Sequence, residues 1–158
     1  MLDSNRLVEY LPRLTPEWVA GFIDGEGCIC AVKRKRSSFG VELSIAQKEP
    51  SILFLLSMKF PDSSAPSVFH NSISGAKCWQ LHWSGSNCLE ILRYVENHVV
   101  LKKKQVELGL RLARFHLRRP EFSRVSDGEK VERRELALAI KSLNEGKTGA
   151  PWYNVEEP

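Results

Sequence analysis

Apolar and polar residues alternate in some stretches of this chain and recur at helical spacing in others. Alternation predicts two β-hairpins, and helical spacing predicts helices before, between and after them. We expect helices at about residues 16–25, 51–60, 87–97, 102–117 and 129–144, and strands at 28–36, 41–48, 66–74 and 77–84. The order α-β-β-α-β-β-α-α, followed by one further helix, is typical of an α+β domain with helices on one face of an antiparallel sheet.

Each hairpin is expected to have one apolar face and one polar face, and the polar face carries basic residues. A turn is predicted at residues 37–40, between the first two strands. The pattern does not decide which face each residue of 66–74 occupies. The apolar parity contains Val41, Leu43 and Ile45 in the second strand, and Trp79, Leu81 and Trp83 in the fourth.

Two carboxylates stand at the end of the first predicted helix. Thr15-Pro16-Glu17 is a typical helix start, with a hydroxyl cap, proline at the first helical position and an acid at the positive end of the dipole. Gly25 and Gly27 predict its end, so Asp24 and Glu26 lie beside free backbone carbonyls. Such an oxygen-rich site suits Mg²⁺. The alternative interpretation is a helix cap followed by a polar turn.

The same helix is apolar on more than one side, which indicates burial on more than one side. Val19, Phe22 and Ile23 form one apolar stripe, and Trp18 lies off it. Small residues, Ala20 and Gly21, also lie off the stripe and would permit close approach of another backbone.

Residues 19–27, Val-Ala-Gly-Phe-Ile-Asp-Gly-Glu-Gly, resemble the motif of the LAGLIDADG homing endonucleases, with five of nine letters identical. The resemblance extends over roughly residues 14–117 and implies the α-β-β-α-β-β-α core of that family, with a four-stranded antiparallel DNA-binding sheet. It divides the chain into a lead-in at 1–14, an endonuclease core at 15–119, and an extra C-terminal helix and tail at 120–158.

The resemblance also implies roles for individual residues. Glu26 aligns with the acid that binds metal, to which the Gly25 carbonyl could add an oxygen, whereas Asp24 aligns with an acid that is mainly structural. Gln47 resembles a residue that holds active-site water, and Lys102 resembles the active-site lysine. Where some relatives place a basic residue, position 51 is serine.

Because the chain has one copy of the motif, the resemblance to single-motif members of the family implies a homodimer whose motif helices pack together at a two-fold axis. An interface of this kind would contain Trp18, Ala20, Gly21 and Asp24.

The polar face of the sheet is expected to lie along the major groove of double-stranded DNA, which admits β-ribbons. Arg34 and Arg36 are the best candidates for base contacts, because arginine binds guanine O6 and N7 in bidentate fashion. The alternative for these arginines is a solvent-facing charged strand. The full set of expected DNA-binding residues is Cys28, Cys30, Val32, Arg34, Arg36, Ser44, Lys48, Gln80 and His82.

Charge and cysteine content add context. The formal net charge is +4, and basic residues cluster at 33–36, at 102–104 and at Arg111, Arg114, Arg118 and Arg119. These clusters could neutralise phosphates, or they could be ordinary solvated faces. The four cysteines form no Cys-x-x-Cys pair, and we interpret them as reduced thiols. A zinc site formed by Cys28, Cys30, Cys78 and His82 is an alternative with no recognised spacing.

The resemblance and the charge pattern together lead us to expect a homing endonuclease. It would be a homodimer, depend on Mg²⁺ or another divalent cation, and cleave a long, near-palindromic DNA site. The rivals are a non-cleaving nucleic-acid-binding protein, such as an intron RNA maturase, and an α+β interaction domain without nucleic acid. No apolar stretch approaches the ~18 residues of a membrane span, and no signal peptide is evident. We therefore expect a reducing intracellular location, in an organelle or in bacterial or phage-infected cytoplasm.

Overall fold

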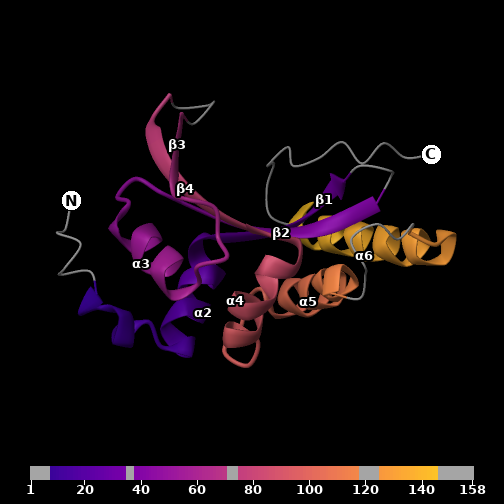
Figure 1. The fold of residues 1–158 in the computed structure, drawn as a ribbon, viewed down its shortest axis with the longest axis horizontal. Helices are drawn as coiled ribbons and strands as arrows, with labels where there is room; N and C mark the ends of the chain where they lie inside the picture. The colour runs from indigo at the N-terminus through magenta and orange to yellow at the C-terminus, as the bar shows by residue number, and fades with distance from the viewer. Residues whose placement is uncertain (1–7, 35–37, 71–74, 118–124, 146–158) are drawn as a thin grey trace.

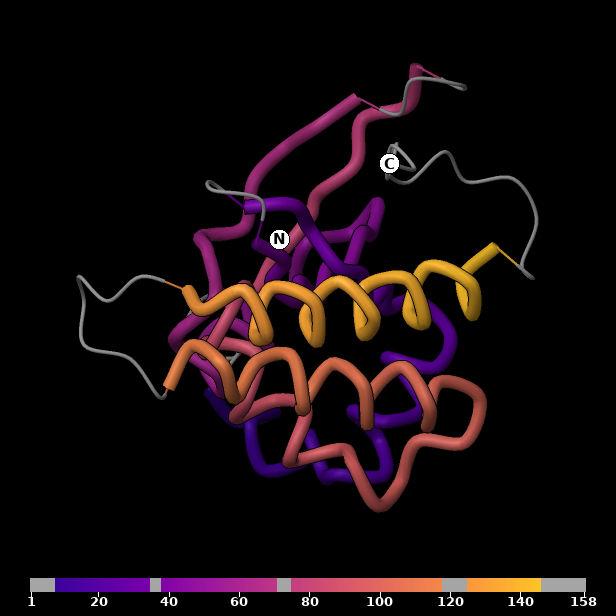
Figure 2. Tube along the Cα trace, turned by 90° about the vertical axis from the view of Figure 1, so that its right-hand side faces the viewer, coloured from indigo at the N-terminus to yellow at the C-terminus, as the bar shows by residue number. Residues whose placement is uncertain are grey.

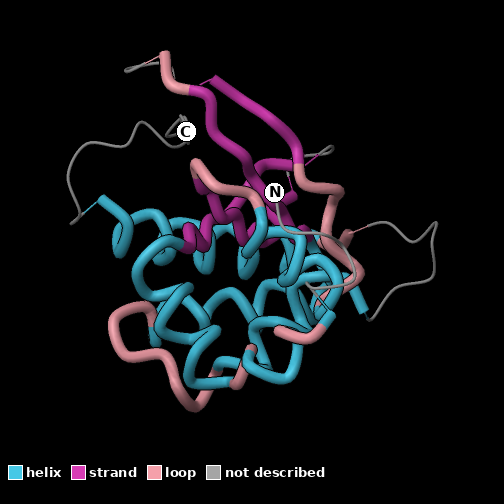
Figure 3. The backbone as a smooth tube through the Cα atoms, turned by 90° about the vertical axis from the view of Figure 1, so that its left-hand side faces the viewer, coloured by secondary structure: helices cyan, strands magenta, loops and turns pink. Residues whose placement is uncertain are grey.

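A computed structural model describes residues 8–34, 38–70, 75–117 and 125–145 (Figure 1). Its sheet lies over a layer of helices, as Figure 3 shows from the side. The elements are the 3₁₀ turn η1 (Leu11–Arg13), α2 (Pro16–Glu26), β1 (Gly27–Arg34), β2 (Ser38–Gln47), α3 (Ser51–Lys59), β3 (Ser67–His70), β4 (Lys77–Ser84), the 3₁₀ turn η3 (Gly85–Asn87), α4 (Cys88–Val95), α5 (Lys103–Leu117) and α6 (Asp127–Glu145).

The four strands form one antiparallel sheet in the order β1-β2-β4-β3, which confirms the predicted α+β class. Ile29 pairs with Leu43, and Ile45 pairs with Leu81. These four side chains are buried against the helices, so the predicted apolar parity is correct. The other face of the strands carries the polar residues, as two-residue alternation requires.

Two details of the hairpins differ from the prediction. The strand β2 begins at Ser38 rather than at residue 41, because Phe39 pairs with Lys33 and buries its ring in the core. Residues 38–40 of the expected turn therefore belong to β2, and residue 37 lies outside the described part of the chain. In β3, the register assigns the face that the pattern left open, since Ser67 and Phe69 pair with Gln80 and Cys78 on the polar side.

The last helix, α6, packs against α5, β1 and β2. Figure 2 shows α6 and α5 side by side and running in opposite directions. One face of α6 is buried and joins the main core through Leu136, Ala137 and Ile140. Near its end, Asn144 Nδ2 donates to the Ile29 carbonyl of β1 at 2.9 Å. Within the described residues, no helix has both the length and the apolar content to cross a membrane.

Candidate active site

The helix α2 begins as predicted and ends one residue later than predicted. Thr15 Oγ1 accepts from the Trp18 backbone N–H at 3.3 Å, with Pro16 at the first helical position. Gly25 does not end the helix, which continues through Glu26 and passes directly into β1. Gly27 is required there by close packing, because a Cβ on it would lie 2.8 Å from the Ile23 carbonyl oxygen.

The Asp24 carboxylate connects the end of α2 to the start of α5. It accepts backbone hydrogen bonds from Val100 at 2.7 Å, Leu101 at 3.2 Å and Lys102 at 2.9 Å. Partial burial alone would raise the pKa of Asp24, but these three N–H groups and the Lys102 charge together lower it. Asp24 thus stabilises the fold at neutral pH, and that contribution is lost as the pH falls through its lowered pKa.

Lys102 makes the reciprocal connection. Its ammonium donates to the Ile23 carbonyl at 2.9 Å and also to the Asp24 carbonyl, at the negative end of the α2 dipole. The position of this ammonium shows that the carbonyl end of α2 accommodates a cation. Lys102 also precedes α5, and its own carbonyl accepts the Val106 N–H at 2.9 Å.

Glu26 and Gly25 follow this cation-binding end directly, and both are exposed. A Cβ on Gly25 would meet no atom within 4 Å, so the space beside its Cα is open. Gln47 lies nearby, because the register places Gly27 opposite Ile45 and Gln47 is two residues further along β2. The three residues predicted to be catalytic, Glu26, Gln47 and Lys102, therefore gather around the end of α2.

The polar face of the sheet begins at this same end of α2. Cys28, Ser44, Gln80 and His82 are partly exposed on it, as expected for residues that contact a ligand. Cys30 and Val32 share the face but are only 6% and 8% exposed, so little of either side chain is accessible for the DNA contact predicted for it. Lys48 is exposed just beyond β2, and Arg36 lies outside the described residues.

Arg34 lies across β2 instead of standing away from the sheet. A Cβ on Gly40 would be 3.2 Å from Arg34 Nε and 3.0 Å from His116 Nε2, so the missing side chain makes room for both. Further along β2, Glu42 Oε1 lies 3.4 Å from Nδ1 of His82. The alternation in the sequence places Glu42 on the polar face. Beyond its charge, nothing in the sequence indicates that Glu42 is a functional residue.

The thiols divide into two kinds. A hydrogen bond from Cys30 and the nearby Lys102 charge outweigh the effect of burial and lower the pKa of Cys28 to about 7. Burial raises the pKa of Cys88 to about 12. Among the described residues, no three His, Cys, Asp or Glu side chains are grouped so as to bind a metal, so the alternative zinc site is not supported.

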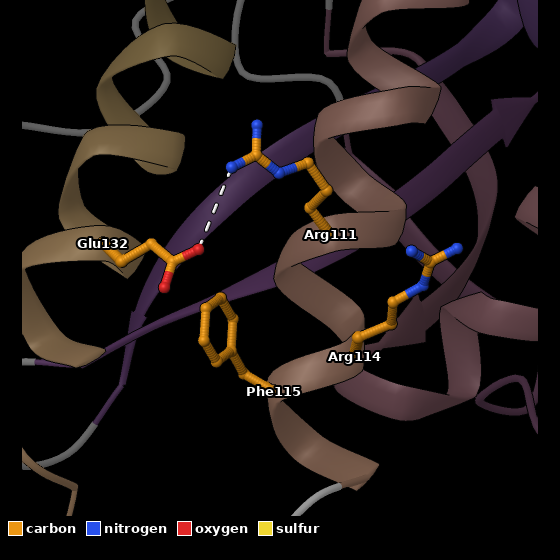
Figure 4. A pocket seen from close by; sticks show the side chains of 4 residues that line it. All are labelled: Arg111, Arg114, Phe115 and Glu132. Atoms are coloured by element: carbon orange, nitrogen blue, oxygen red, sulfur yellow. Dashed lines mark ion pairs between the residues drawn. The ribbon is translucent and has the colours of Figure 1, made fainter.

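The two members of the third basic cluster that the structure describes lie on the helical layer and not on the polar face of the sheet. Arg111 and Arg114 project from α5 beside α6, where Phe115 and Glu132 complete a pocket (Figure 4). Arg111 points toward Glu132, at 3.8 Å, while Arg114 points away from that carboxylate. These arginines are therefore not part of the polar face next to α2.

One side of α2 is open to solvent. A Cβ on Gly21 or Gly25 would meet no atom within 4 Å, and Trp18 stacks on Phe22 with ring centroids 5.2 Å apart. Ala20 is 0% exposed within the single chain, so its predicted place in a dimer interface is wrong.

The carboxylate of Asp24, also expected in that interface, is directed toward α5. Next to the bonds that it accepts, Val100 and Leu101 are exposed by 78% and 66%.

Comparisons with known proteins yield no matching family model and no matching curated protein. Solved structures do match. The homing endonuclease I-CvuI, in complex with DNA, superposes with a TM-score of 0.64 and 22% identity over 89% of this chain and 88% of that chain. The archaeal intron-encoded I-Vdi141I, also with DNA, gives 0.65 and 13% over 90% and 88%. The LAGLIDADG meganuclease I-AabMI gives 0.58 and 20% over 85% of this chain and 46% of that chain.

The chain therefore has the homing-endonuclease fold. Within that class, the resemblance to the LAGLIDADG enzymes is confirmed at the level of the fold. The match to I-CvuI covers 89% of the chain, which is more than the span of 14–117 inferred from the sequence.

Proposed function

We propose that this protein is a homodimeric, site-specific endonuclease that cleaves double-stranded DNA with the help of a divalent cation. The observation that carries the proposal is the position of Glu26. It is exposed at the end of α2, with Gln47 and Lys102 around it, where the polar face of the sheet begins. The solved relatives I-CvuI and I-Vdi141I are complexes with DNA, which supports DNA as the ligand.

The Glu26 carboxylate and the Gly25 carbonyl would hold Mg²⁺, which prefers oxygen ligands and keeps several waters. Such an ion supplies an activated water and neutralises charge on the phosphate. Two side chains of the protein would assist the reaction. The Lys102 ammonium stabilises negative charge that develops on the phosphate, and the Gln47 amide orients water by hydrogen bonding.

The polar face of the sheet supports binding in the major groove. The ten residues of β2 extend over roughly 33 Å at ~3.3 Å per residue, enough to follow several base pairs. Lys48 and Arg34 supply positive charge near phosphates or base edges. Phosphate contacts of this kind make affinity fall steeply as salt rises.

A second copy of the chain fits the open side of α2. The chain covers only 46% of I-AabMI, so two copies correspond in length to that protein. Gly21 and Gly25 would allow two α2 helices to approach closely, flanked by Trp18 and Phe22. Two copies would also place two Glu26 carboxylates in one assembly, one for each DNA strand.

Gly21→Leu is expected to convert the dimer into a monomer, because the new side chain would occupy the surface where the second α2 packs. Sedimentation equilibrium of both proteins measures the effect. Gly128→Leu is the matched control, since Gly128 is also a helical glycine whose Cβ would meet no atom within 4 Å. A Gly21→Leu protein that remains dimeric would exclude this side of α2 from the interface.

The function itself is tested by incubating the protein with a randomised plasmid library in Mg²⁺ and sequencing the linear products. We expect a shared, near-palindromic site, and no product when EDTA replaces Mg²⁺. Absence of cutting together with salt-sensitive recovery of bound DNA or RNA would favour the non-cleaving alternative, of which an intron maturase is one example. Weak binding that is independent of salt would favour the plain interaction domain.

A further inference from the structure

Glu42 is the one carboxylate on the polar face among the strand residues that the structure describes. It lies in the middle of the sheet, paired with Cys30 of β1 and with Ser84 of β4. An acid here is unexpected on a surface that approaches DNA, because a carboxylate near phosphate is repelled. Against DNA, such a carboxylate is favourable where it faces base edges that donate hydrogen bonds.

The carboxylate is held in a defined place by its neighbours. Nδ1 of His82 lies 3.4 Å from Oε1, and the two side chains are only 29% and 23% exposed, respectively. The hydrogen bond to His82 outweighs burial and, with the Arg34 charge, lowers the pKa of Glu42. The group is therefore ionised at neutral pH, and an ionised carboxylate has the capacity to accept several hydrogen bonds.

Glu42 and Arg34 together match one base pair. In the major groove, cytosine presents the N4 amino group as a donor, and guanine presents O6 and N7 as acceptors. A carboxylate accepts from cytosine N4, and a guanidinium donates to guanine O6 and N7. Gly40 leaves space for Arg34 to lie across β2, the strand that also carries Glu42. The Arg34 donor and the Glu42 acceptor are therefore presented on the same part of the sheet.

We propose that Glu42 is a specificity-determining residue that accepts a hydrogen bond from a cytosine amino group, with His82 as the residue that positions its carboxylate. The proposal rests on the proposed DNA cleavage. Cys30, the partner of Glu42, is three residues beyond Gly27, or about 10 Å along β1. At 3.4 Å per base pair, the affected position is about three base pairs from the DNA beside the end of α2.

The test is a cleavage profile in which each position of the half-site is varied through all four base pairs. The wild type is expected to favour cytosine at one position by about 5- to 150-fold. Glu42→Gln should move the preference at that position toward adenine, since glutamine pairs with adenine N6 and N7. Glu42→Ala should remove the preference, and His82→Ala should weaken it without changing the preferred base.

Glu96→Gln is the matched control, because it makes the same chemical change at an exposed residue on the helical side. A profile unchanged in both Glu42 variants would overturn the proposal. A loss of preference at many positions at once would also overturn it, since that result indicates a disturbed sheet. If the wild type cuts no DNA, the proposed function fails before Glu42 is tested, so the two failures are distinguishable.

Discussion

Glu26→Gln is expected to abolish DNA cleavage while leaving the dimer and DNA binding nearly intact. The exposed side chain at the end of α2 has room for the isosteric amide, so the fold should lose no more than about 0.5 kcal/mol. The negative charge that would hold the divalent cation is removed, however. We expect a loss of at least 10²–10³-fold, roughly the effect of removing one group that stabilises charge in a transition state.

Single-turnover cleavage of the selected site measures this effect, and a mobility-shift titration measures binding. Glu96→Gln again serves as the control, because it removes the same charge from an exposed position at the end of α4. Wild-type cleavage by Glu26→Gln would remove this residue from the active site. Parallel loss of binding, dimer and folding would instead indicate a structural role, like that of Asp24.

The contrast between Asp24 and Glu26 illustrates what a sequence can and cannot predict. Local spacing is enough to place both acids at the end of a helix, and the resemblance to the motif predicts a structural role for Asp24 and metal binding for Glu26. The partners of Asp24 are 76–78 residues away along the chain, at the start of α5. Only the tertiary structure brings those N–H groups to the carboxylate.

Helical periodicity also leaves the two sides of α2 unassigned. Both Ala20 and Gly21 are small, and the helix is apolar around most of its circumference, so the sequence does not tell which one faces the core of its own chain. The structure buries Ala20 and opens Gly21 and Gly25 to solvent. Strand parity was predicted more reliably for Leu43, because two-residue alternation leaves only two choices.

Close packing was the least predictable feature. The sequence predicts Gly27 only as a residue that ends the helix. The structure shows in addition that a side chain at this position would clash with the Ile23 carbonyl oxygen. Gly40 reads as a turn residue, yet it lies in β2 and leaves space for Arg34 and His116. The contact at Gly27 lies four residues back at the helix–strand junction, and Gly40 also meets His116, which is 76 residues further along the chain.

Arg133→Met is expected to destabilise the protein by about 3–5 kcal/mol, the usual cost of breaking one side of a buried ion pair. Arg133 is 3% exposed, and its Nη2 lies 2.6 Å from Glu129 Oε1. It also donates to the Phe39 carbonyl at 3.3 Å and the Phe115 carbonyl at 3.4 Å, so it ties α6 to β2 and α5. Urea unfolding followed by circular dichroism measures the change.

The matched control is Lys141→Met, which breaks an ion pair of the same i,i+4 spacing on the same helix but at its surface. Screening by water should limit that loss to about 0.3–0.5 kcal/mol. The double variant Arg133→Met with Glu129→Met should lose less than the sum of the two single variants, because the second change removes the carboxylate that the first leaves unpaired. Strict additivity would show that Arg133 stabilises α6 through its two carbonyl contacts and its packing on Phe115, and not through Glu129.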